Sequence, residues 1–66
     1  MQLIVNGEER QVENTLTLGK FLALCALPSK MVAVERNGEI VPREKYDVTT
    51  LANGDVLEIV QMMAGG

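Results

Sequence analysis

Three Asn-Gly pairs divide the chain, at positions 6–7, 37–38 and 53–54. The first follows the aliphatic run 2–5 directly, and two residues separate the second from the apolar run 31–34. An Asn-Gly pair after such a run is the strongest short-range signal for a β-hairpin, because both residues accept the positive φ of a tight turn. We therefore expect two hairpins, and a third turn that leads into a last strand.

The strands of the two hairpins differ in polarity. The return strand of the first, residues 10–13, is polar apart from Val12 and indicates a sheet edge whose charges discourage further pairing. Run 31–34 is continuously apolar, so we expect it to be covered on both faces, or nearly so. Its return strand, residues 39–41, is closed by Pro42, which cannot donate to a ladder.

One helix is predicted between the two hairpins. Thr17 is a suitable N-cap, because its hydroxyl can accept a hydrogen bond from one of the first free N–H groups. The residues after it have the i, i+3, i+4, i+7 spacing of an apolar helix face: Leu18, Phe21, Leu22 and Cys25. Pro28 indicates that the helix has ended by Leu27.

The remaining segments complete one small domain. Residues 43–50 are polar, with Tyr46 and Val48 as anchors, and predict a loop with one helical turn. In the last strand, residues 55–60, alternation places Leu57 and Ile59 on one face. Val56, Glu58 and Val60 lie on the other. One helix that follows two strands must cover one face of a four- or five-stranded mixed sheet. The fold class is therefore α+β, with a domain over residues 1–61 and a flexible tail over residues 62–66.

Composition argues against several functions. The chain has 66 residues and two aromatic side chains, which leaves little room for a deep pocket beside an aliphatic core. Six basic residues are scattered among nine acidic ones, so the net charge of −3 does not suit a nucleic-acid binder. An acidic surface suits a basic partner, although solubility alone also explains it. No apolar run is long enough to span a membrane.

Few side chains suit catalysis or metal binding, and we predict no catalytic residue and no metal site. Histidine is absent, and Ser29 has no base to activate it. Cys25, the single thiol, excludes an internal disulfide, and its place on the helix face favours core packing over a nucleophile. A chain of this kind suits a reducing cytoplasm. The glutamates at positions 8, 9 and 13 lack calcium-loop spacing and suggest a solvated edge.

The last five residues, Met62-Met63-Ala64-Gly65-Gly66, present a different chemistry. Glycine lacks a Cβ, so Gly65 and Gly66 can thread a narrow channel and deliver a free α-carboxylate. The simpler alternative is a short flexible end with two small residues. Met62 and Met63 suit adaptable contacts with a partner, or Met62 ends the last strand and covers the core.

A carboxylate at the tip can be activated by another enzyme. Its charge resists nucleophilic attack, and a mixed anhydride with AMP supplies a good leaving group. A sulfur nucleophile can then displace AMP and leave a thiocarboxylate on Gly66. The activating enzyme needs ATP and Mg²⁺ for the phosphates. This chain needs only to reach the other active site, and five extended residues span about 17 Å.

The sequence resembles the ThiS family, the small sulfur-carrier proteins of thiamine biosynthesis, which have a β-grasp (ubiquitin-like) fold. The resemblance covers essentially the whole chain, and Tyr46 stands where the family often has Trp. It is carried by these segments: Asn6-Gly7-Glu8, Thr17-Leu18, Phe21-Leu22, Val32-Ala33-Val34-Glu35, Ile40-Val41-Pro42-Arg43-Glu44, Gly54-Asp55, Glu58-Ile59-Val60 and Ala64-Gly65-Gly66.

The resemblance implies a fold, a modified residue and partners. The first and last strands are adjacent and parallel at the centre of the sheet. Gly66 is adenylated by an adenylyltransferase related to the ubiquitin-activating enzymes and converted to a thiocarboxylate with sulfur from an upstream transfer enzyme. Gly65, Ala64, Met63 and Met62 enter the partner active sites. The sulfur passes to thiazole synthase, and the carrier, monomeric when free, binds no cofactor and is not itself an enzyme.

Three other functions remain open at this point. The small subunit of molybdopterin synthase is also a β-grasp protein that ends in Gly-Gly, but its family is usually longer and lacks Ile40-Val41-Pro42-Arg43 in this form. A ubiquitin-like modifier shares the adenylation step and then forms isopeptide bonds with lysines. A plain interaction domain that presents its sheet predicts that deletion of Gly65 and Gly66 is harmless.

Overall fold

The computed structural model describes residues 1–62 and contains five strands, one α-helix and two 3₁₀ segments within them. In chain order the elements are β1 Gln2–Val5, β2 Glu8–Gln11, α1 Leu18–Leu24, η1 Ser29–Met31, β3 Val32–Arg36, β4 Glu39–Ile40, η2 Arg43–Val48 and β5 Val56–Gln61. The order of the elements and the α+β class agree with the prediction. Residues 1–62 form no helix that is long and apolar enough to cross a membrane.

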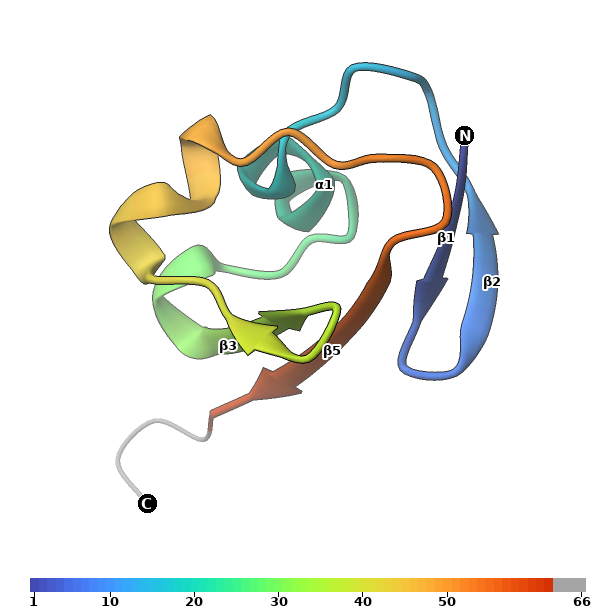
Figure 1. Ribbon diagram of the computed structural model, residues 1–66. Coiled ribbons are helices and arrows are strands. Elements are labelled where there is room, and N and C mark those ends of the chain that lie inside the picture. The colour runs from blue at the N-terminus through green and yellow to red at the C-terminus, as the bar shows by residue number, and fades with distance from the viewer. Residues whose placement is uncertain (63–66) are drawn as a thin grey trace.

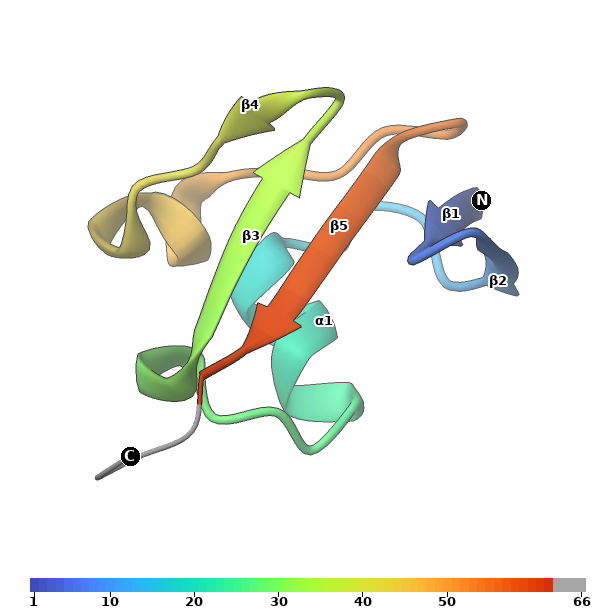
Figure 2. The same ribbon diagram turned by 90° about the horizontal axis from the view of Figure 1, so that it is seen from below.

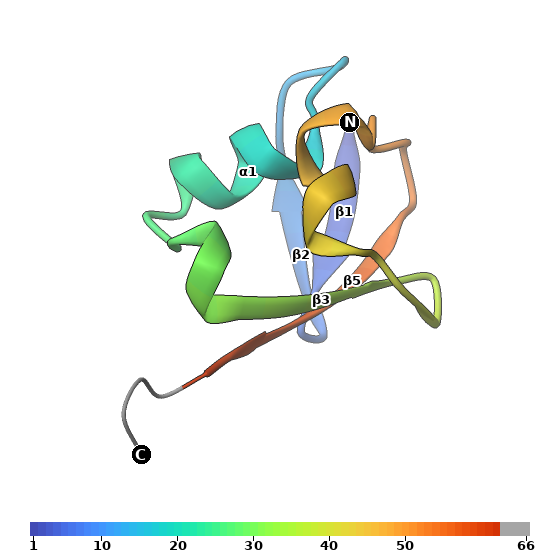
Figure 3. The ribbon, with the colours of Figure 1, turned by 90° about the vertical axis from the view of Figure 1, so that its left-hand side faces the viewer.

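The strands form one mixed sheet in the order β2-β1-β5-β3-β4. The last strand, β5, occupies the centre, where it is parallel to β1 and antiparallel to β3. Figure 1 shows β5 between β3 and β1, and Figure 2 shows α1 behind the sheet. Seen from the side, α1 lies on one side of β3 and β5 (Figure 3). The central parallel pair that the resemblance implied is therefore present.

Both hairpin turns are formed by an Asn-Gly pair with positive φ. The angles are 50° and 83° at Asn6 and Gly7, and 53° and 86° at Asn37 and Gly38. A turn of two residues lets the return strand begin at once. For this reason β2 starts at Glu8, and the prediction of a return strand over residues 10–13 was wrong in its bounds.

Helix α1 begins as predicted. The backbone N–H of Lys20 donates to Thr17 Oγ1, with an N–O distance of 3.2 Å. Leu18, Phe21 and Leu22 are buried, and Cys25 follows the last helical residue as a half-buried C-cap. Burial of this face supplies the packing energy that a seven-residue helix needs, because so short a helix is marginal in isolation.

The core lies between α1, η2 and one face of the sheet. Its buried apolar residues are Leu3, Val5, Leu16, Leu18, Phe21, Leu22, Val32, Val34, Tyr46, Leu51 and Leu57. Tyr46 is buried as predicted, and its hydroxyl donates to the carbonyl oxygen of Val32 at 3.2 Å. Val48 was expected to be an anchor, but 71% of it is exposed because it lies at the end of η2, away from the core.

Strand β3 corrects a second expectation. Val32 and Val34 are buried, whereas Ala33 and Glu35 are exposed. The helix covers one face of the sheet, and within residues 1–62 no second layer covers the other. The apolar run 31–34 is therefore buried on one face only. Its partner β4 ends at Ile40, one residue before the predicted end, although the Val41 N–H still donates to the Val34 carbonyl at 2.9 Å.

Candidate functional site at the end of the central strand

The end of β5 carries the predicted tail. The last register pair between β3 and β5 joins Val32 to Gln61. One further hydrogen bond follows, in which the Met62 N–H donates to the Met31 carbonyl oxygen with an N–O distance of 2.6 Å. The sheet thus guides the chain as far as Met62. The other predicted tail residues, Met63, Ala64, Gly65 and Gly66, lie outside the described residues.

The side chain of Met62 is close to the sheet but does not enter the core. Its exposed fraction is 42%, and it is absent from the buried cluster. The structure therefore excludes the interpretation in which Met62 ends the last strand and covers the core. A partner contact for Met62 stays a prediction.

Two asparagine side chains fasten β5 to the turns at its start and its middle. Asn6 Nδ2 donates to the Ile59 carbonyl at 3.2 Å, and the Ile59 N–H donates to Asn6 Oδ1 at 2.7 Å. At the start of β5, the Val56 N–H donates to Asn37 Oδ1 at 2.9 Å. The two Asn-Gly turns thus shape their hairpins and also hold the strand that leads to the tail.

A buried carboxylate secures the turn before β5. Asp55 is only 5% exposed, and its carboxylate accepts hydrogen bonds from Arg36 Nε, Asn37 Nδ2 and the Ala52 N–H at 2.8, 3.0 and 2.8 Å. Burial raises the pKa of Asp55, but the hydrogen bonds from Ala52, Asn37 and Arg36, with the charge of Arg36, outweigh burial and lower the pKa below 3.8. Asp55 is a structural group. Sequence reasoning placed it at the start of the last strand, whereas β5 begins one residue later, at Val56.

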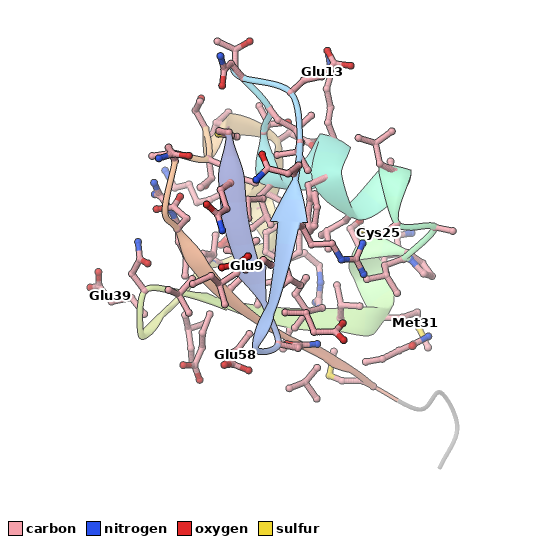
Figure 4. The ribbon with its side chains drawn as sticks, turned by 90° about the vertical axis from the view of Figure 1, so that its right-hand side faces the viewer. Glu9, Glu13, Cys25, Met31, Glu39 and Glu58 are labelled. Carbon is pink, nitrogen blue, oxygen red and sulfur yellow. The ribbon has the colours of Figure 1, made fainter. Side chains whose placement is uncertain are left out.

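The sheet face opposite α1 forms an exposed surface that reaches Met62. Alternation and register place the following residues on this face, which we call the outer face: Gln2, Ile4, Glu9, Gln11, Ala33, Glu35, Ile40, Val56, Glu58, Val60 and Met62. Ile40 is 77% exposed and Val60 is 62% exposed. Figure 4 shows Glu58 pointing away from α1. An exposed group of aliphatic side chains of this kind is typical of an interaction surface.

Two glutamates lie at the centre of the outer face. Glu35 and Glu58 are register partners on neighbouring strands, and both are exposed. Ile40 is the register partner of Glu35 on the other side, in β4. Like charges directly opposite each other destabilise a sheet. The pair therefore destabilises the sheet of the free chain. The two carboxylates also give the outer face an acidic centre surrounded by aliphatic residues.

The other side chains considered for chemistry are not assembled into a site. Cys25 packs against the core, as its position on the helix face predicted. It also borders a hollow between the end of α1 and β1, which Arg10 and Gln61 help to line. Figure 4 shows Cys25 near the end of α1, with Glu9 and Glu13 on the β2 side of the molecule. Within residues 1–62 no three His, Cys, Asp or Glu side chains are grouped to hold a metal.

Comparisons with known proteins agree with this geometry. The model of the ThiS family matches residues 3–66. The chain is also 40% identical over 65 residues to the sulfur carrier protein ThiS of Bacillus subtilis, and the match covers 97% of this chain and 98% of that protein. The chain belongs to the ThiS family. Membership confirms the resemblance, and it favours the sulfur-carrier interpretation over the molybdopterin synthase and modifier alternatives.

A solved ThiS structure has the same fold. The crystal structure of the thiamine biosynthesis protein ThiS from Geobacter metallireducens superposes with a TM-score of 0.82 at 39% identity, over the full length of both chains. The β-grasp arrangement, with β5 central and α1 on one face, is thus the ThiS fold.

The ThiS-family chain also matches part of two larger proteins. A thiazole synthase of Paramagnetospirillum magneticum is 44% identical over 66 residues, which is all of this chain but 20% of that protein. A thiazole synthase of Magnetococcus marinus is 39% identical over 67 residues, again 20% of its length. The chain therefore spans about a fifth of these two relatives.

Proposed function

We propose that this ThiS-family chain carries sulfur for thiamine biosynthesis on the carboxylate of Gly66. The observation that carries the proposal is the match with the Bacillus subtilis sulfur carrier, which extends over 98% of that protein. The geometry of β5 supports it, because the central strand leads to Met62, which lies at the surface and begins the predicted tail.

The proposed chemistry begins with activation. A carboxylate oxygen of Gly66 attacks the α-phosphorus of ATP, the bond to pyrophosphate breaks, and an acyl adenylate forms. We assign ATP and Mg²⁺ to an adenylyltransferase related to the ubiquitin-activating enzymes, because Mg²⁺ and the phosphates need a dedicated site. This chain is the co-substrate of that reaction, binds no cofactor of its own and supplies no catalytic side chain.

Sulfur then replaces AMP. A persulfide on an upstream transfer enzyme attacks the acyl carbon, and AMP leaves with the electron pair of the C–O bond. A thiol then attacks the resulting acyl disulfide, so that the thiocarboxylate leaves and the thiol becomes part of a new disulfide. The thiocarboxylate delivers its sulfur to thiazole synthase. We propose that the carrier, monomeric when free, and its partners act in the cytoplasm.

We further propose that thiazole synthase docks on the outer face. Two relatives contain a region similar to this whole chain within a thiazole synthase polypeptide, which favours a lasting contact between a carrier domain and that enzyme. The outer face reaches Met62, so a partner bound there lies next to the start of the tail. Its acidic centre suits a partner surface with an arginine or lysine among apolar residues.

Intact mass spectrometry tests the sulfur-carrier proposal. The full chain is incubated with the adenylyltransferase of its own organism, ATP, Mg²⁺ and a persulfide donor. We expect a mass increase equal to the replacement of one oxygen by sulfur, which requires ATP. A variant with one residue added after Gly66 is the matched control, because residues 1–62 are the same in both chains. This variant should gain no sulfur. Equal sulfur gain by both chains contradicts the proposal, and lysine-linked conjugates would indicate a modifier.

A further inference from the structure

Arg43 connects η2 with the segment that precedes β3. Its Nε donates to the Ser29 carbonyl oxygen at 3.1 Å, and its Nη2 donates to the Val32 carbonyl oxygen at 3.4 Å. Ser29 is the first residue of η1, and Val32 is the residue that follows it. One guanidinium therefore spans the whole of η1.

The segment η1 has little packing of its own. None of its three residues is buried, and Ser29 and Lys30 are exposed. A segment with few buried apolar contacts opens easily unless hydrogen bonds hold it. Its position therefore depends on polar contacts such as those of Arg43. Tyr46 adds a second donor at Val32, whereas Arg43 reaches the Ser29 end as well.

The third residue of η1 holds the start of the tail. The Met31 carbonyl oxygen, which lies between the two carbonyls that Arg43 contacts, accepts the hydrogen bond from the Met62 N–H. This bond lies beyond the last register pair of β3 and β5. Figure 4 places Met31 beside the end of the described chain.

We infer that Arg43 is a positioning residue for sulfur transfer: it holds η1 so that the Met31 carbonyl fixes the point at which the tail leaves the domain. The inference rests on the proposed function. Five extended residues reach about 17 Å, so the position and direction of Met62, the first tail residue, decide where Gly66 arrives in a docked complex. Reactions of this kind are sensitive to misplacement of about 1 Å.

The fork of the arginine side chain is essential to this role. A guanidinium presents several N–H donors in a fixed plane and can hold two carbonyls together. A lysine ammonium keeps the charge but is a single point with rotating donors. Arg43→Lys is therefore expected to lose the hydrogen bond at one end of η1. Arg43→Met is expected to lose both hydrogen bonds, to Ser29 and to Val32.

Amide hydrogen exchange measured by NMR on the full chain tests the structural part. In Arg43→Met and Arg43→Lys, the Met62 amide should exchange about fivefold faster or more, because local opening no longer needs to break the η1 contacts. The exchange rate of the backbone N–H of Asn6, which donates to the Leu57 carbonyl at 2.9 Å in the sheet centre, should be unchanged. Lys45→Met is the matched control, since Lys45 is an exposed cation in the same segment η2.

The functional part is tested by kinetics with the adenylyltransferase and a persulfide donor. We expect kcat for thiocarboxylate formation to fall about tenfold in Arg43→Met with little change in KM, because the substitution alters one side chain of η2 and leaves the rest of the domain surface unchanged, while the tail is misplaced. Lys45→Met should match the original chain.

Several results would overturn the inference. Unchanged Met62 exchange in Arg43→Met would show that Arg43 does not hold the tail start, and equal acceleration at Met62 and Asn6 would show only a loss of stability. Full recovery by Arg43→Lys would show that charge, without the fork, is sufficient. A thiocarboxylate absent even from the original chain contradicts the proposed function instead, and Met62 exchange then still decides whether Arg43 holds η1.

Discussion

The side-chain amide of Asn6 acts as an extension of the backbone of β1 toward Ile59. The register of β1 and β5 ends with Val5 opposite Leu57. Beyond it, Asn6 Oδ1 accepts from the Ile59 N–H at 2.7 Å, and Asn6 Nδ2 donates to the Ile59 carbonyl at 3.2 Å. A turn residue thus supplies the donor and the acceptor that a further strand residue would have given.

Replacement of Asn6 should weaken the domain in a graded way. Asn6→Ala removes both bonds and places Ala at a φ of 50°, so we expect a loss of about 1–3 kcal/mol in the free energy of unfolding. Asn6→Gly also removes the bonds but tolerates the positive φ, and should lose less. Urea unfolding measures both. Asn14→Ala, at an exposed loop position, is the control and should change little. Equal stability of Asn6→Ala and the original chain would contradict the role given to this amide.

Asp55 should make the stability of the domain depend on pH in the acid range. Its folded pKa is lowered from 3.8, so the unfolded chain binds the proton first as the pH falls. The contribution of Asp55 to stability is therefore fully present above the unfolded pKa and is lost as the pH falls through the folded pKa. Urea titrations between about pH 7 and pH 2 should show the advantage of the original chain over Asp55→Asn shrinking below about pH 4. An advantage that grows toward low pH would contradict the sign of the shift.

Glu58 should stabilise a complex while destabilising the free domain. Glu58→Gln removes the charge opposite Glu35, so its free energy of unfolding should exceed that of the original chain by about 0.2–1 kcal/mol. The same variant should bind thiazole synthase more weakly, because the acidic centre of the outer face is reduced. Calorimetric titration at two salt concentrations measures the affinity and its electrostatic part.

Glu13→Gln provides the matched control for Glu58, since Glu13 is an exposed glutamate outside the outer face. It should alter neither the affinity nor its salt dependence. Undiminished binding by Glu58→Gln, or an equal loss in both variants, would argue against docking at the outer face. Loss of binding to the adenylyltransferase alone would move the proposed contact to that enzyme.

Cys25 is expected to matter for stability and not for sulfur chemistry. Its side chain packs against the core, so Cys25→Ala should lower the free energy of unfolding by about 1 kcal/mol, the size of a small lost apolar contact. Thiocarboxylate formation should continue at the original rate. Chemical denaturation and intact mass together measure the two effects. A well-folded Cys25→Ala chain that gains no sulfur would overturn the packing interpretation.

Local signals in the sequence predicted the turns and the helix correctly. The Asn-Gly pairs dictate hairpin turns because only a few residue types accept positive φ. Thr17 and the spacing of Leu18, Phe21 and Leu22 dictate the start and the buried face of α1. The resemblance added the central pairing of β1 and β5, which no local pattern contains. Gly65 and Gly66 were recognised from the sequence alone, and their place lies outside the described residues.

Tertiary structure decided which side chains meet. The hydrogen bonds of Asn6 with Ile59, and of Arg43 with Ser29, join residues far apart in sequence, so they depend on strand register and on how η2 packs. The hydrophobicity of run 31–34 could not reveal that Ala33 faces solvent, because the same apolar pattern occurs in strands that are covered on one face and on both. By itself, the sequence determined the order of the elements and led to the predicted chemistry at Gly66. Only the packed sheet determined the outer face and the point where the tail begins, since both require distant segments to be placed side by side.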